Sequence, residues 1–141
     1  MTPDQVKLVQ TSFAQVAPIA DHAATMFYDY LFAIAPSAKQ LFKGDMVEQR
    51  RKLVAMLAAV VNGLGDLHSI LPAASALAKR HVSYGVEAGH YAIVGQTLLW
   101  TLEQGLGSAW TKDLAAAWTA AYTMLADFMI AEAYGRPVAA E

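Results

Sequence analysis

The sequence predicts an all-α fold of six to eight helices, and three observations support it. Apolar residues recur at the three- and four-residue spacing of amphipathic helices along most of the chain. Proline and glycine fall between these periodic segments, where helices begin and end. No sustained alternating, valine-rich run with flanking turn residues is found, so no strand is predicted. At 141 residues, the chain is expected to form a single domain over residues 1–141.

The first two helices are expected on either side of Pro18. Thr2, Pro3 and Gln5 have the order of a capping residue, a first-turn proline and a capping-box partner. The inward face of this first helix is Val6, Val9, Phe13 and Val16. Pro18 should open the second helix, whose inward face is Ala20, Ala24, Phe27, Tyr28 and Leu31. Pro36 then starts a short turn that leads to Leu41 and Phe42.

A long third helix is expected to begin at Asp45 and to end near Gly63 and Gly65. Asp45 can cap it, and Glu48 and Lys52 form a favourable pair four residues apart. Its inward face is Met46, Gln49, Leu53, Leu57, Val60 and Leu64. The polar amide of Gln49 departs from this otherwise apolar face, and its position there needs an explanation. A loop through residue 68 follows.

His81 lies near the end of a short helix that we expect to run from Pro72 to Gly85. Proline suits a first helical turn, and glycine can supply the left-handed residue that ends a helix. With Leu77 one turn earlier, His81 falls on the apolar side. A neutral imidazole held there can give one nitrogen to a helix carbonyl and the other to iron or zinc. Taken alone, such a histidine is more often a core residue bonded to a carbonyl.

Two further helices complete the predicted fold. The first runs from about Ala88 to Glu103 and is followed by a glycine-rich turn over residues 105–108. Thr111 can cap the last helix, which should extend to about Tyr134. The inward faces contain Tyr91, Val94, Leu98 and Leu102 in the first, and Leu114, Trp118, Ala121, Leu125, Phe128 and Glu132 in the second. Residues 135–137 form a stop signal, and a frayed end is expected after them.

Composition limits the possible chemistry. The chain is 56% hydrophobic and 16% charged, which indicates a large core or one that encloses an apolar group. It has no cysteine, and this excludes disulfides, thiolate zinc sites and iron–sulfur clusters. A net charge of −2 without a long basic run argues against a nucleic-acid partner. Neither an export signal nor an uninterrupted apolar stretch of about 18 residues is found, so we expect a cytoplasmic protein without a membrane span.

An ordered set of motifs gives a family resemblance. In chain order they are Phe27-Tyr28, Pro36, Leu41-Phe42, Gln49, Leu53, Arg80-His81, Tyr84-Gly85-Val86 and the run from His90 to Gly95. With these residues at these spacings, nearly the whole chain resembles a globin. It most resembles the bacterial single-domain haemoglobins related to the haem domain of flavohaemoglobins. The resemblance favours a ligand role for His81 over a purely structural one.

The resemblance implies one haem b, held without covalent attachment because no cysteine can form a thioether. His81 matches the family's iron ligand, and Tyr28 and Gln49 match the pair above the open iron position. Phe42 matches the aromatic residue on the haem face, and Leu53 matches the residue that limits ligand size. The remaining residues assigned to the cofactor pocket are Leu77, Val86, Tyr91 and Val94. A buried haem would also explain so apolar a core.

The distal pair carries the predicted ligand chemistry. Bound dioxygen takes on negative charge, so a phenol and an amide donor would stabilise it by about 1 to 3 kcal/mol each in a dry pocket. The alternatives are a core tyrosine bonded to a carbonyl for Tyr28 and a partly exposed polar residue for Gln49. Because glutamine matches the distal position, closure of the iron by a second histidine is not expected from that site. Water, hydroxide or an open sixth position is expected there.

On the proximal side, flavohaemoglobins support the ligand histidine with a tyrosine and a glutamate. Tyr91 matches the tyrosine, and Glu132 is the candidate acid. Glu132 is about one residue out of register, which rotates it by about 100° on a helix. If it reaches His81 through Tyr91, it favours redox chemistry; the alternative is a solvated surface carboxylate.

Two function classes follow from the resemblance. The first is an enzyme that converts nitric oxide and dioxygen to nitrate. The chain ends where the family's flavin and nicotinamide domains would begin, so we expect a separate reductase as the partner. The second is a protein that stores, delivers or senses dioxygen, or binds another diatomic gas, without turnover. A haem-free signalling module would require His81 to be lost or shielded.

Overall fold

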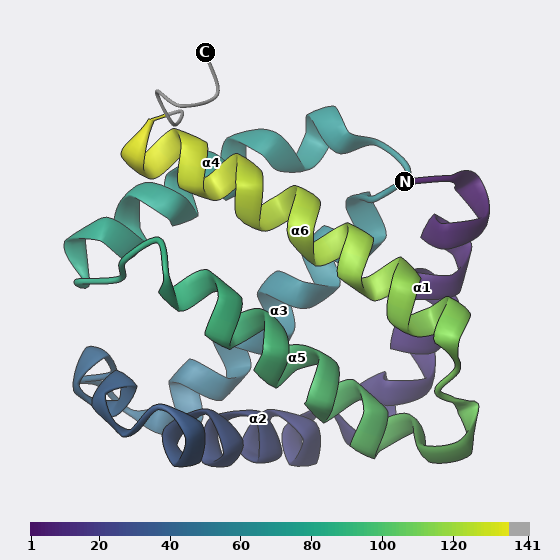
Figure 1. The fold of residues 1–141 in the computed structure, drawn as a ribbon, viewed down its shortest axis with the longest axis horizontal. Coiled ribbons are helices and arrows are strands. Elements are labelled where there is room, and N and C mark those ends of the chain that lie inside the picture. The colour runs from purple at the N-terminus through teal and green to yellow at the C-terminus, as the bar shows by residue number, and fades with distance from the viewer. Residues whose placement is uncertain (136–141) are drawn as a thin grey trace.

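The computed structural model describes residues 1–135 as six α-helices with three short 3-10 turns (Figure 1). The helices are α1 (Pro3–Val16), α2 (Ala20–Ile34), α3 (Met46–Gly63), α4 (Leu67–Ser83), α5 (His90–Leu106) and α6 (Lys112–Tyr134). The turns are η1 (Ala17–Ile19), η2 (Pro36–Leu41) and η3 (Gly107–Ala109). These described residues contain no strand, so the predicted all-α fold is confirmed. The end predicted to fray after residue 135 lies outside them.

Three of the predicted helix starts are confirmed. The Thr2 hydroxyl accepts a hydrogen bond from the Gln5 backbone N–H at 3.1 Å, and the Gln5 side-chain oxygen accepts from the Thr2 N–H at 3.0 Å. Asp45 and Thr111 cap α3 and α6, where their side-chain oxygens accept from backbone N–H groups at 2.9 and 3.1 Å. Each cap satisfies an amide that has no partner inside the helix.

The start of α4 differs from the prediction. The helix begins at Leu67 rather than at Pro72, and Pro72 lies inside it. At the sixth position Pro72 removes one bond of the ladder, because its nitrogen carries no hydrogen to donate to the carbonyl of residue 68. The helix nevertheless continues through Pro72, and His68 is helical rather than in a loop. At the other end Gly85 has a φ of 92°, which confirms the predicted left-handed stop.

Three local predictions need smaller corrections. Pro18 lies in η1, so α2 begins two residues later than expected. α5 continues to residue 106, three residues past its predicted end, because Gly105 alone does not break the helix. Glu48 pairs with Arg51 at 3.3 Å instead of with Lys52. Both side chains of this ion pair are exposed to solvent, so its contribution to the stability of the protein is small.

The helices enclose two apolar clusters. α6 packs against α4, α1 and α5, while α2 packs against α5 and α3. In Figure 1, α4 lies along the top and α2 along the bottom, α6 crosses diagonally from α4 toward α1, and α3 and α5 lie in between. The larger cluster draws buried residues from α1, α2, α3, α5 and α6, and the smaller one from α4, α5 and α6. Tyr122 packs against both clusters, which therefore adjoin each other.

Among the described residues, α6 alone is long and apolar enough to cross a membrane by length and composition, with a mean hydropathy of 1.3 over its most apolar window. Its contacts with three other helices explain that composition. Its apolar side chains form parts of both clusters, as expected of a central helix in a helical domain.

Candidate functional site

His81 lies in the last turn of α4 with its two ring nitrogens in different surroundings. Nδ1 is 2.7 Å from the Leu77 carbonyl oxygen. Because a carbonyl can only accept, Nδ1 carries the proton and Nε2 keeps a free lone pair. Burial lowers the pKa of His81, the Leu77 bond opposes that shift, and the charge of Arg80 adds to it. The imidazole is therefore neutral at pH 7, the form that binds a metal ion.

Tyr28 of α2 and Gln49 of α3, the pair that the family resemblance assigns to the open iron position, are in contact. The Gln49 amide nitrogen donates to the Tyr28 phenol oxygen at 3.1 Å. Tyr28 is 4% exposed, and Phe42 packs edge-on against it with ring centroids 5.3 Å apart. Burial raises the pKa of Tyr28, although Gln49 and the charge of Arg50 oppose the rise. The phenol therefore stays protonated, and since its oxygen accepts from Gln49, its hydrogen remains available to a third group.

The other predicted pocket residues divide between the two clusters. Those that pack with Tyr28 against the larger cluster are Phe42, Leu53 and Val94. Those in or against the smaller cluster are Leu77, Val86 and Tyr91. One set belongs to the side that carries the donor pair, and the other to the side that carries His81. A neutral imidazole on one side, two donors on the other and apolar walls between them fit the chemical needs of a haem.

Glu132 does not join this site. Its side chain is exposed and accepts a hydrogen bond at 2.7 Å from the hydroxyl of Ser75 on α4. The neighbouring residue Ala133 packs against the cluster that contains Tyr91. The one-residue difference in register therefore rotates the carboxylate out of the site, as the alternative interpretation of Glu132 expected. Ser75, which the sequence analysis did not single out, holds it at the surface.

Tyr91 reaches the proximal side without a polar partner. Its ring is 7% exposed and lies nearly parallel to the His81 ring, with centroids 6.4 Å apart. Its buried hydroxyl has no hydrogen-bond partner among residues 1–135. Burial raises the pKa of Tyr91, and Tyr134 raises it further. Tyr91 therefore packs against the histidine ring rather than linking it to a carboxylate.

Replacement of Tyr91 by phenylalanine is expected to leave the fold intact and to keep or raise its stability. The change removes a buried hydroxyl without a partner, which is neutral or favourable by about 1 kcal/mol. Thermal unfolding of wild type and Tyr91→Phe, each loaded with haem, measures the difference. A loss of more than about 2 kcal/mol would show that the hydroxyl has an acceptor after all. The matched control is Tyr122→Phe, because the Tyr122 hydroxyl donates to the Tyr91 carbonyl at 2.7 Å and its loss should destabilise.

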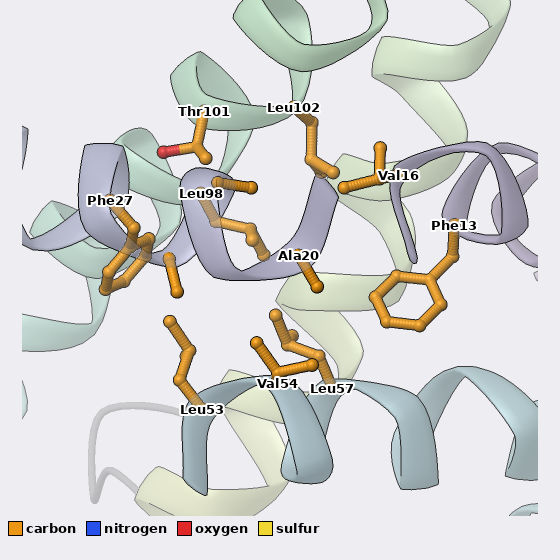
Figure 2. A pocket seen from close by; sticks show the side chains of 12 residues that line it. Phe13, Val16, Ala20, Phe27, Leu53, Val54, Leu57, Leu98, Thr101 and Leu102 are labelled. Atoms are coloured by element: carbon orange, nitrogen blue, oxygen red, sulfur yellow. The ribbon is translucent and has the colours of Figure 1, made fainter. Parts of the chain in front are cut away.

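A small apolar cavity lies next to Phe27 and Leu53, which are neighbours of the site (Figure 2). It has a volume of about 40 Å³ and is lined by residues of α1, α2, α3 and α5. Phe27 and Leu53, which neighbour the site, form one end of its lining, and its polar residue Thr101 donates to a backbone carbonyl within α5. Because the lining offers water few partners, the cavity suits a small apolar molecule.

The family model described as Globin matches residues 25–129, which span α2 through most of α6. The chain is a globin. Membership in this family shows that the protein binds haem and small diatomic ligands, and it agrees with the arrangement of His81, Tyr28 and Gln49 described above.

This globin is similar in sequence to bacterial flavohemoproteins. It is 35% identical to the flavohemoprotein of Bordetella parapertussis over 133 residues, covering 92% of this chain and 33% of that protein. The flavohemoprotein of Bacillus subtilis is 29% identical over 130 residues, again with 33% of its length covered. The chain thus spans about a third of these curated relatives. The family and the relationship predicted from the sequence motifs are confirmed.

Two solved structures share the fold of this globin. An engineered carbene transferase from Rhodothermus marinus, described as a candidate nitric oxide dioxygenase, is 25% identical with a TM-score of 0.83, covering 92% of this chain and 90% of that one. A bacterial globin from Campylobacter jejuni has a TM-score of 0.81 at 24% identity, covering 93% and 95% of the two chains. The second comparison supports the fold alone.

Proposed function

We propose that this globin, in the cytoplasm, holds one haem b through His81 and combines nitric oxide with dioxygen to give nitrate. The observation that carries the proposal is the hydrogen bond from Gln49 to Tyr28, which directs a second donor, the phenol O–H, away from the amide. The relative described as a candidate nitric oxide dioxygenase supports the same chemistry. A separate protein is proposed to supply the electron.

Haem supplies an iron atom that binds a diatomic gas and changes its oxidation state by one electron. The overall reaction takes one nitric oxide, one dioxygen and one electron to one nitrate ion. Tyr28 would donate a hydrogen bond to the oxygen atoms as they gain negative charge, and a fixed donor lowers the barrier most at that point. Gln49 donates to the phenol oxygen of Tyr28 and so directs the phenol hydrogen away from the amide. Leu53 and Phe42 keep water from the donors.

A second candidate function is the storage, delivery or sensing of dioxygen without turnover. The placement of Glu132 favours it, because the carboxylate lies at the surface with Ser75 instead of on the proximal side. His81 then has only the Leu77 carbonyl to make its ring more electron-donating. A less electron-donating histidine ligand would suit reversible binding better than redox turnover.

The two functions differ in what happens after the first reaction with nitric oxide. Ferrous protein equilibrated with oxygen is mixed with nitric oxide in a stopped-flow instrument, and nitrate is measured with and without NADH and a bacterial flavin reductase. We expect one nitrate per haem without reductant and many with it. Absence of nitrate in the first mixing rejects the dioxygenase proposal. Exactly one turnover with every reductase tried supports the storage function instead.

A further inference from the structure

Positive charge gathers on two segments that border the haem site. Residues 39–52 and 79–87 together contain seven of the ten Lys and Arg residues, but three of the twelve Asp and Glu residues. The remainder of the chain contains three basic and nine acidic residues. These two segments, which we call the basic rim, therefore carry a surplus of four positive charges in a protein whose net charge is −2.

The two segments of the basic rim adjoin each other in space. A Cβ atom added to Gly85, which follows α4, would lie 3.5 Å from the Leu41 side chain at the end of η2. In Figure 1, η2, the start of α3 and the turn between α4 and α5 lie at the same end of the molecule, opposite the start of α6. Arg50 directly follows Gln49 in α3, and Arg80 directly precedes His81 in α4. The rim therefore flanks both sides of the site.

Exposed apolar side chains accompany these charges. Tyr84 is 57% exposed, Val47 48% and Val82 42%. The exposed basic residues of the rim are Lys39, Lys43, Arg51, Lys52, Lys79 and Arg80. In the described part of the chain, the only ion pair formed by these residues joins Arg51 to Glu48. A partner protein could cover these apolar side chains, and the surrounding unpaired charges would form the polar edge of that contact.

Tyr84 links this surface to the iron ligand. Its ring centroid lies 6.3 Å from that of His81, while its side chain is the most exposed of the large apolar residues. A protein that covers Tyr84 and Val82 would thus lie close to the His81 ring. Electron transfer between proteins requires such closeness of the donor to the acceptor group.

We propose that the basic rim is the docking surface for a one-electron donor protein with an acidic face. The inference rests on the proposed function, because each nitrate formed leaves ferric iron that must regain one electron. No bond forms in this step: one electron leaves the reduced flavin of the donor and enters the ferric haem. A bound haem brings two carboxylates, fewer than the four surplus charges of the rim. The rim therefore stays positive and attracts an acidic partner at long range.

The test measures reduction of the ferric holoprotein by photoreduced flavodoxin, a flavoprotein with an acidic surface, in the absence of nitric oxide. We expect Lys79→Glu combined with Arg80→Glu to lower the second-order rate constant by about tenfold at low ionic strength. Lys39→Glu combined with Lys43→Glu, on the other segment, should slow it in the same way. The wild-type rate constant should fall as salt is added, because salt screens the attraction.

Two controls separate docking from general effects. Lys7→Glu combined with Lys112→Glu changes the net charge equally at α1 and at the start of α6, and should stay within about twofold of wild type. Photoreduced riboflavin should reduce all variants alike, which shows that the haem site is intact. The proposal is overturned if both rim variants match wild type, or if the control pair slows as much as they do. It is also overturned if flavodoxin reduces all variants equally while wild type alone binds phosphatidylglycerol vesicles.

Because nitric oxide is absent from this assay, the outcome is independent of nitrate formation. If the protein makes nitrate but its reduction rate does not depend on the charges of the basic rim, only the docking surface is rejected. If the rim charges control the reduction rate but no nitrate is formed, only the proposed reaction is rejected.

Discussion

His81→Ala is expected to abolish stable haem binding. His81 has its Nδ1 held by Leu77 at 2.7 Å, so Nε2 is free to bind iron at a fixed orientation. The other histidines are placed differently: His22 and His68 are exposed, and His90 accepts a bond from the Glu87 N–H through Nδ1 at 2.8 Å. Since even the loss of groups that orient a metal ligand weakens binding by about 10- to 100-fold, loss of the ligand itself should exceed that.

The measurement is the Soret absorbance of purified protein titrated with haem, and the matched control is His90→Ala. The control should bind haem as wild type does. Added imidazole should restore part of the absorbance in His81→Ala, because a free ring can enter the space left by the side chain. An unchanged Soret band in His81→Ala would remove the ligand role, and with it the proposed function.

The helical framework could be predicted from the sequence because its signals are local. Thr2, Asp45 and Thr111 each act within three residues of their own position, and Gly85 acts through its own φ angle. The start of α4 could not be predicted in this way. Pro72 favours a first turn, but the helix accepts it in the second turn at the loss of one backbone bond, because the earlier start buries Ile70.

The site shows the same division between local and long-range information. The Leu77 carbonyl was predictable as an acceptor for His81 because the two lie one turn apart on one helix. The meeting of Tyr28 and Gln49, which are 21 residues apart, depends on how α2 packs on α3, and family motifs were needed to predict it. The bond from Ser75 to Glu132 joins residues 57 apart. A serine on a helix surface carries no signal of such a partner.

Tyr28→Phe is expected to accelerate dioxygen dissociation by about 5- to 150-fold, the equivalent of a lost hydrogen bond of about 1 to 3 kcal/mol. Phenylalanine keeps the ring that packs on Phe42 and Phe27 with centroids 5.3 and 5.0 Å away. The change therefore removes the donor without opening the wall. Flash photolysis or stopped-flow mixing with carbon monoxide measures the dissociation rate, and a rate equal to wild type would show that Tyr28 gives no bond to the ligand.

Gln49→Leu distinguishes how the amide contributes. If Gln49 acts by holding the Tyr28 oxygen at 3.1 Å, its replacement speeds dissociation in wild type but has little further effect in Tyr28→Phe. If Gln49 instead donates directly to the ligand, the two changes in activation free energy add in the double variant. The observed direction of the bond, from the amide nitrogen to the phenol oxygen, favours strong coupling between the two substitutions. Additive effects would show that the two donors act independently, and that the arrangement of the ligand-free protein does not persist once dioxygen is bound.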